Sequence, residues 1–307
     1  MVKAVITSIG CEWHAKILYK HVKELDQYDI EYIQYEDLVN QGDLVWDVDV
    51  LFNMGAFGDW WNFYKILKAR NPNLKIVNIW AGTDILNFAT WTERSPSCRD
   101  CMLRWVDEHA TTSDILQKEL TALGIVAHII PAVPEKNYDV MPLPNAKKIA
   151  TYIPPRRKDF YRYDVLVAVA EKFPDVHFHV FALSNEDKEN TKPPVDNIHF
   201  EGFVTGEEKD NWVRDTKAFL SVIKHAGVGV MLIEWKQAGR YAIANRHIPY
   251  CYEVRTMQDI YDAIEDVIDK KEPDYEGAKY FQEHYNPSVV RKSFIHVMDT
   301  VLGGTVE

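Results

Sequence analysis

The sequence has little of several features that would narrow its function at once. Positive charge is scarce, because 35 Lys and Arg stand against 46 Asp and Glu and leave a net charge of −11. General nucleic-acid binders concentrate Lys and Arg against phosphates, so the balance argues against that class while leaving room for a local basic pocket. No run of 18 apolar residues occurs, so we expect no transmembrane helix.

We also expect neither a leader nor a cysteine framework. The first residues, MVKAVITSIG, lack the long apolar region and cleavage site of a signal peptide and indicate a first strand instead. We therefore expect a cytoplasmic chain whose four cysteines stay reduced. Cys98 and Cys101 form one C-x-x-C, with His109 as the nearest histidine. A zinc site needs a second pair or nearby histidines, so we favour two ordinary thiols over a metal or redox role.

Apolar strand-like runs alternate with helical periodicity along 307 residues, a length that suggests two domains. In the first half we expect strands over 2–9, 31–35, 45–52, 75–80 and 125–130, and helices over 14–25, 60–69 and 115–123. In the second half we expect strands over 148–153, 176–183, 197–203, 218–223 and 241–244, and helices over 166–173, 207–216 and 257–267. Alternation of this kind predicts parallel α/β sheets.

A proline-rich stretch over 131–144 separates the two series and is the best linker candidate. The sequence thus predicts two doubly wound, Rossmann-like domains, over 1–145 and 146–285, facing a cleft. A last helical pattern is broken at Asn286-Pro287, and we expect its final part, 286–307, to cross back onto the first domain. Ligands of such sheets bind beyond the carboxyl ends of the strands.

The stretch IKHAGVGVMLIEWKQAGRYAI (223–243) passes from the end of a strand through two glycines into a helical pattern. Gly227 and Gly229 let the backbone approach a ligand closely, because they carry no Cβ. A helix starting near Val230 offers unpaired N–H groups and a positive dipole end to an anion. Glu234, about one turn further on, can accept two hydroxyl hydrogen bonds, as a ribose supplies. The alternative is a loop that serves packing alone, with Glu234 solvated.

A basic stretch, PPRRKDFYR (154–162), directly follows the strand over 148–153. Arg156, Arg157, Lys158 and Arg162 lie there in an otherwise acidic chain. Arg side chains match phosphate oxygens in bidentate fashion. A helix N-terminus disfavours cations, so we favour anion binding over a solvated run of charge.

These two stretches resemble the retaining glycosyltransferases of family 4, which have the GT-B fold. In that family the second domain opens with a strand and G-R-x4-K-G, whose Arg and Lys grip the donor diphosphate. Arg157-x4-Arg162 has this spacing, with Arg for Lys and without the flanking glycines. The family's E-G-F-G-x4-E-A-x-A-x-G is similar to AGVGVMLIEWKQAG (226–239). FPDVHFHVFA (173–182) and IHFEGFVTGEE (198–208) follow the order of the family's intervening strands.

The resemblance implies roles for named residues. Arg157 and Arg162 would neutralise the leaving diphosphate and Glu234 would hold the ribose. The donor-binding residues that it implies are Gly10, Arg156, Lys158, Phe203, Val204, His225, Gly227, Val228 and Gly229.

In the first half the match is looser. WAGTDIL (80–86) resembles the family's H-G-x-D turn, with Ala81 at the histidine position. We place His14 and Asp84 near the acceptor, with a surface histidine and a helix-capping Asp as the alternatives.

One departure from the family concerns the transferred sugar. Ala226 replaces the first acid of the glutamate pair, which in the family touches the hydroxyls of that sugar. Alanine cannot accept those hydrogen bonds, although His225 could supply a polar group from the preceding position. Sugar choice therefore does not follow from the sequence, and an inactive relative stays open.

The resulting expectation is a metal-independent retaining glycosyltransferase without a cofactor. Its donor would be UDP- or GDP-linked, and its acceptor a hydroxyl of a glycan, a lipid or a small molecule. The lack of an obvious carboxylate pair favours front-face transfer over hydrolysis. Two alternatives remain: a nucleotide-sugar epimerase using His225, His14 and Asp84, and a non-catalytic nucleotide-sugar-binding relative. Peripheral membrane contact and oligomeric state stay open.

Overall fold

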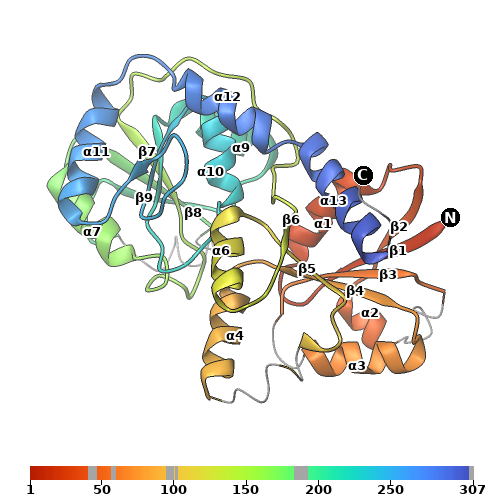
Figure 1. Ribbon diagram of the computed structural model, residues 1–307. Helices are drawn as coiled ribbons and strands as arrows, with labels where there is room; N and C mark the ends of the chain where they lie inside the picture. The colour runs from red at the N-terminus through yellow and green to blue at the C-terminus, as the bar shows by residue number, and fades with distance from the viewer. Residues whose placement is uncertain (41–46, 57–59, 95–99, 101–102, 183–192, 304–307) are drawn as a thin grey trace. The chain divides into compact units, whose positions relative to one another are not determined.

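The computed structural model describes residues 1–40, 47–56, 60–94, 100, 103–182 and 193–303. The chain divides into two compact units. The first comprises Met1–Glu135, Ala226–Val228 and Tyr285–Glu307, and the second comprises Lys136–His225 and Gly229–His284. Each unit is built on its own six-stranded sheet (Figure 1). Across the ranges given above, no helix combines the length and the apolarity needed to cross a bilayer.

The first unit has a parallel sheet in the order β2-β1-β3-β4-β5-β6. Its strands are β1 (Val2–Ser8), β2 (Tyr28–Tyr32), β3 (Val50–Met54), β4 (Lys75–Trp80), β5 (Glu108–Thr111) and β6 (His128–Ile129). The helices described in it are α1 (Glu12–Val22), α2 (Tyr35–Asn40), α3 (Trp60–Arg70), α4 (Thr83–Arg94), α6 (Asp114–Ala122) and α13 (Pro287–Val301).

Helices cover both faces of this sheet. An apolar cluster that includes Trp60, Phe88 and Leu116 joins α3, α4 and α6 to one face. On the other face Phe294 of α13 stacks on Phe52 of β3, with ring centroids 4.5 Å apart. Arg291 Nε donates to the His21 carbonyl at 2.8 Å and fixes α13 to α1. The expected return of the last helix to the first unit is confirmed.

The second unit has a parallel sheet in the order β12-β11-β10-β7-β8-β9. Its strands are β7 (Lys148–Tyr152), β8 (His177–Phe181), β9 (Ile198–Gly202), β10 (Ala218–Ser221), β11 (Tyr241–Ala244) and β12 (Tyr252–Glu253). Its described helices are α7 (Tyr163–Lys172), α9 (Gly206–Asp215), α10 (Val230–Gln237), α11 (Met257–Asp269) and α12 (Tyr275–His284).

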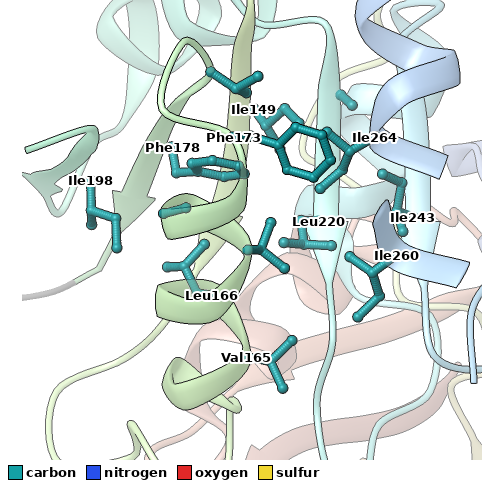
Figure 2. Close-up of a cluster of buried hydrophobic side chains, with 14 of the residues drawn as sticks. Ile149, Val165, Leu166, Phe173, Phe178, Ile198, Leu220, Ile243, Ile260 and Ile264 are labelled. Carbon is teal, nitrogen blue, oxygen red and sulfur yellow. The ribbon is translucent and has the colours of Figure 1, made fainter. Parts of the chain in front are cut away.

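Alternate residues of these strands supply two apolar layers, as the period of a strand dictates. On one face Phe178, Leu220 and Ile243 pack against Leu166 of α7 and Ile264 of α11 (Figure 2). On the other face Phe181 and Phe219 contact Trp235 of α10, with ring centroids 6.0 and 5.3 Å apart. The expected doubly wound α/β architecture is therefore confirmed for each unit.

The order of the second sheet reverses at β7. The chain continues from β7 to β8 and β9 on one side, then crosses to place β10 on the other side. Thr151 of β7 pairs with Leu220 of β10, so the carboxyl ends of these strands lie next to each other. This reversal is the position where doubly wound sheets bind ligands, and both stretches singled out in the sequence follow these two strands.

Candidate functional site

The loops at the carboxyl edge of the second sheet are bound to one another. Lys224, after β10, donates its backbone N–H to the Phe160 carbonyl, after β7, at 2.9 Å. Asn245, after β11, accepts from the Ile223 N–H at 3.1 Å and donates to the Ile223 carbonyl at 2.8 Å. The Asn245 amide thus acts as a peptide would in a sheet. The basic stretch, residues 223–224 after β10 and the loop after β11 form one braced rim.

The cations of the basic stretch lie on this rim in different environments. The Arg157 guanidinium is exposed and lies 4.9 Å from the centroid of the Phe160 ring. Lys158 Nζ lies over the Tyr163 and Phe200 rings, at 5.4 and 5.7 Å. Arg156 is exposed with φ +61°, a region that non-glycine residues rarely adopt. Arg157 is thus an exposed cation in contact with Phe160, whose carbonyl accepts from Lys224.

Arg162 is placed differently from Arg157. It is the residue before α7 and has left-handed backbone geometry, with φ +48°. Its guanidinium pairs with Asp164 at 3.2 Å, which raises the pKa of Arg162 and lowers that of Asp164. An incoming diphosphate would compete with this carboxylate for Nε and Nη2 of the guanidinium.

The glycine loop leads into α10 as the sequence predicts. Gly229 is the N-cap residue, with extended backbone, no side-chain cap and open space where a Cβ would lie. The first turn of α10 contains no acid, so its N-terminal N–H groups and dipole are not offset by a neighbouring carboxylate. His225 is half-buried on the same loop, whereas Gly227 and Val228 group with the first unit.

Glu234 is buried rather than solvated. Only 2% of its surface is exposed, and Oε1 accepts a hydrogen bond from Lys209 Nζ of α9 at 2.5 Å. Oε2 has no hydrogen-bond partner within the described ranges. Burial raises the pKa of Glu234, while the charge and hydrogen bond of Lys209 oppose that rise. The alternative of a solvated Glu234 is therefore wrong.

The end of β9 presents the pair Phe203 and Val204 to the same edge. Phe203 follows β9 and is 71% exposed, while Val204, the next residue, is buried. An exposed aromatic ring beside buried aliphatic side chains offers a flat apolar surface for a planar ligand group.

The sequence reading missed Arg246. This residue comes two positions after β11, and its guanidinium donates to the Ser221 carbonyl and Oγ at 3.2 and 3.1 Å. Burial lowers its pKa to about 10. Burial also raises the pKa of Tyr161 to about 12, against the charges of Arg157 and Arg246. Two guanidiniums therefore act on one phenol at this rim. Its position in the sequence could have indicated it, because Arg246 comes two positions after the predicted strand over 241–244, whose carboxyl end lies at the same edge of the sheet.

In the first unit, the predicted acceptor-side residues have distinct surroundings. Gly10 follows β1 with φ +80°. His14 of α1 is half-buried, and burial lowers its pKa. Asp84 is fully buried and accepts from the backbone N–H groups of Ala56, Ala81, Gly82 and Ile85 at 2.7 to 3.2 Å. These bonds favour the capping alternative for Asp84 over contact with an acceptor.

In the part of the chain that the structure describes, no group of three or more His, Cys, Asp or Glu side chains is arranged so that it could hold a metal ion. Cys98 and Cys101 lie outside the described residues.

Comparison with known proteins identifies the fold of this chain through solved structures. No protein-family model matches the sequence, and no curated protein does. Solved structures match well: sucrose-phosphate synthase from Thermosynechococcus elongatus has a TM-score of 0.71 at 11% identity, over 99% of this chain and 100% of that one. TarM from S. aureus, in complex with UDP, has a TM-score of 0.62 at 15% identity and covers 85% of this chain. This chain spans only 58% of TarM.

A third similar structure, from Listeria monocytogenes, is provisionally named UDP-N-acetylglucosamine 2-epimerase. Its TM-score is 0.57 at 11% identity, over 98% of this chain and 97% of that one. At these identities the similarity shows the fold alone. The GT-B-like fold expected from the order of the motifs is confirmed.

Proposed function

We propose that the chain is a glycosyltransferase that moves a sugar from a nucleotide-diphosphate donor to an acceptor hydroxyl with retention. The observation that carries this proposal is the junction at the strand-order reversal of the second sheet. There the basic stretch and the glycine loop, recognised separately in the sequence, are joined by the Lys224–Phe160 hydrogen bond. A cation and an uncapped helix N-terminus at one edge suit a diphosphate.

Each part of the donor has a candidate partner. Arg157 and the N-terminus of α10 would bind the diphosphate, with Arg246 as a second cation and Arg162 after exchange of Asp164. Glu234 would accept from the ribose, and Phe203 with Val204 would contact the base. During transfer, the bond between the sugar and the diphosphate breaks as the acceptor oxygen bonds to the same face of the sugar, and the proton of the acceptor hydroxyl passes to the leaving diphosphate. Fixed cations stabilise the charge that grows on the leaving diphosphate.

The first experiment is a thermal-shift panel of UDP, GDP and other nucleoside diphosphates. A ligand at 100 times its dissociation constant should stabilise the folded protein by about 2.7 kcal/mol. The variant Arg157→Ala should lose this shift. Lys147→Ala is the matched control, because Lys147 is an exposed cation at the opposite end of β7 and should keep it. If no nucleotide shifts the wild-type midpoint, the proposal fails.

A second candidate function is nucleotide-sugar epimerisation, which the similarity to the Listeria structure favours. The nucleotide that gives the largest shift should be tested as its sugar conjugates, with and without a panel of hydroxyl acceptors. Release of free nucleotide that depends on acceptor supports transfer, and retention is read from the anomeric signal of the product. An epimeric nucleotide sugar formed without acceptor supports the epimerase. Binding without either product supports a non-catalytic relative, to which Ala226 would point.

A further inference from the structure

Glu234 is a buried carboxylate whose hydrogen bonding is half complete. Lys209 occupies Oε1 at 2.5 Å, while Oε2 accepts no hydrogen bond in the described part of the protein. A buried charge with one oxygen unsatisfied is costly, and such groups usually have a further partner. At the edge of a ligand-binding sheet, that partner can be a hydroxyl of a bound ligand.

Lys209 belongs to α9, which starts just after Phe203 and Val204 at the carboxyl edge. About 21% of its side chain is exposed, compared with 2% for Glu234. Lys209 is therefore the outer member of the pair. We propose that Lys209 is a positioning residue, which holds Glu234 in its charged form and leaves Oε2 to accept from a ribose hydroxyl of the donor. This inference rests on the proposed function.

The charge of Glu234 depends on few neighbours. The titratable groups that face it are Lys209 and Asp210 of α9, and Lys136 and Tyr138 at the start of the second unit. Asp210 disfavours a second negative charge, but it is itself engaged by Lys136 Nζ at 2.5 Å and Tyr138 Oη at 2.8 Å. Among these groups, Lys209 is thus the cation in direct contact with Glu234. Its removal would leave burial as the dominant influence on the pKa of Glu234.

The same network fixes the position of Lys209. Tyr138 donates its hydroxyl to Asp210 of α9 and its backbone N–H to Gln237 Oε1 of α10, the latter at 3.3 Å. The segment around residue 138 therefore ties the first half of α9 to α10. The contacts of Tyr138 therefore fix α9 relative to α10, and with it the backbone position of Lys209 beside Glu234.

The consequence is a change in the pH dependence of nucleotide binding. Without Lys209, the charge and hydrogen bond that oppose burial are lost, so the pKa of Glu234 rises further and the neutral acid is favoured. A protonated carboxyl is a weaker acceptor for the ribose, because one of its oxygens now carries a proton. Binding by Lys209→Met should therefore be weaker than that of wild type, by a factor that shrinks as the pH rises.

The experiment measures the dissociation constant of UDP, or of GDP if it gives the larger thermal shift, by calorimetry at several pH values. We expect Lys209→Met to bind roughly tenfold more weakly than wild type near pH 7, with the ratio shrinking towards pH 9. Lys209→Arg should restore binding. Arg214→Met is the control, since Arg214 is an exposed cation at the other end of α9 and should change nothing.

A second variant covers the case in which Lys209→Met does not fold. Glu234→Gln and the double variant Lys209→Met/Glu234→Gln remove the buried charge. If Lys209 acts only through Glu234, the double variant binds as Glu234→Gln does, without pH dependence from this pair. A loss in Lys209→Met that is independent of pH and adds to that of Glu234→Gln would overturn the inference, because Lys209 would then contact the nucleotide itself. Absence of binding by wild type would instead refute the proposed function.

Discussion

Asp84 and Glu234 are both buried acids, yet their hydrogen bonds differ in kind. The Asp84 carboxylate is surrounded by backbone N–H groups from the loops after β3 and β4. Among the residues that the structure describes, Glu234 has a single side-chain partner and one unsatisfied oxygen. A carboxylate whose bonds are complete stabilises the framework, whereas one with an open acceptor can take a ligand. This contrast separates two acids that the sequence reading had both placed in the site.

Asp84→Ala should therefore lower stability rather than binding. Removing the acid leaves buried N–H groups of Ala56, Ala81 and Gly82 without an acceptor, a loss of about 3 kcal/mol in the free energy of unfolding. Urea unfolding measures this, and Asp84→Asn, which keeps one carbonyl acceptor, should lose less. If Asp84→Ala unfolds like wild type but fails to use acceptors, the acceptor-side role would be correct instead.

The histidines of β8 and β9 give a pH prediction. His177 Nδ1 lies 2.9 Å from His199 Nε2, and the His199 ring stacks on both His177 and His179. Burial first, then the charges of His179 and His177, lowers the pKa of His199, while Glu201 raises it and Lys148 lowers it.

A histidine with a lowered folded-state pKa favours folding above its unfolded pKa of about 6.5 and loses that contribution as the pH falls below it. The urea midpoint of wild type should drop between about pH 7.5 and about pH 5.5. His199→Gln should drop less. His284→Gln is the control, because it removes a histidine of α12 that stacks on Tyr280, away from these strands. Equal drops in all three proteins would show that His199 is not responsible.

At the residue scale, sequence patterns singled out Arg157 and Glu234 as candidates but not Arg246 or Lys209. The first two lie at recognisable spacings from glycines or other cations. Arg246 and Lys209 gain their importance from partners distant in sequence, Ser221 and Glu234. Such pairing is set by packing, which periodicity does not encode.

At the scale of elements, the break between α12 and α13 was predicted and is observed. Asn286 caps α13 by accepting from the N–H groups of Ser288 and Val289, and Pro287 takes the first helical position. Proline suits that position because its missing N–H would be unpaired there. Asn286→Ala should cost about 1 kcal/mol of unfolding free energy, measured by urea titration, while Asn286→Asp should keep the cap. Equal losses in both variants would contradict the capping role.

Arg240 joins several elements of the second unit. Its buried guanidinium donates to the carbonyls of Met141, Pro142, Val213 and Arg214 at 2.8 to 3.1 Å. Arg240→Met should destabilise the protein by about 3 kcal/mol, because buried carbonyls lose a charged donor. Arg240→Lys should recover part of this, since lysine cannot reproduce the planar fork. Thermal unfolding tests it, and an unchanged midpoint in Arg240→Met would show that water replaces the guanidinium.

Element prediction succeeded where local pattern and tertiary pairing agree. The strands over 75–80 and 241–244 have the predicted bounds. The run over 125–130 was predicted as a strand, yet only His128–Ile129 pairs as β6. Ile125, Ala127 and Ile130 are nevertheless buried. Apolarity therefore predicted burial correctly, whereas strand pairing depends on a neighbour. The four residues of β5, EHAT, are too few and too polar for apolar periodicity to reveal.

At the scale of the molecule, nucleotide binding should be visible as a local footprint. Hydrogen exchange with and without UDP should slow in 154–162, 203–209, 222–225 and 245–247, which carry the braced rim and the start of α9. Residues 147–148, at the opposite edge of the same sheet, should not respond. Slowing spread evenly through the second unit would indicate general stabilisation rather than this site.

The fold could be predicted at this scale because the order of motifs constrains topology more strongly than any one motif. The sugar and the acceptor could not. Ala226 removes the group from which the family's sugar contacts would have been inferred, and no other pattern in the sequence replaces that information.

The path of the chain has a consequence for how the protein is made. The first unit needs α13, yet α13 is encoded after the whole second unit. During synthesis, the whole second unit is therefore translated while the first unit still lacks the helix that covers Phe52 and contacts α1. The nascent first unit exposes that apolar face for the time needed to translate nearly half the protein. Its maturation is a late event, and chaperones that shield apolar surface would act on the amino-terminal half.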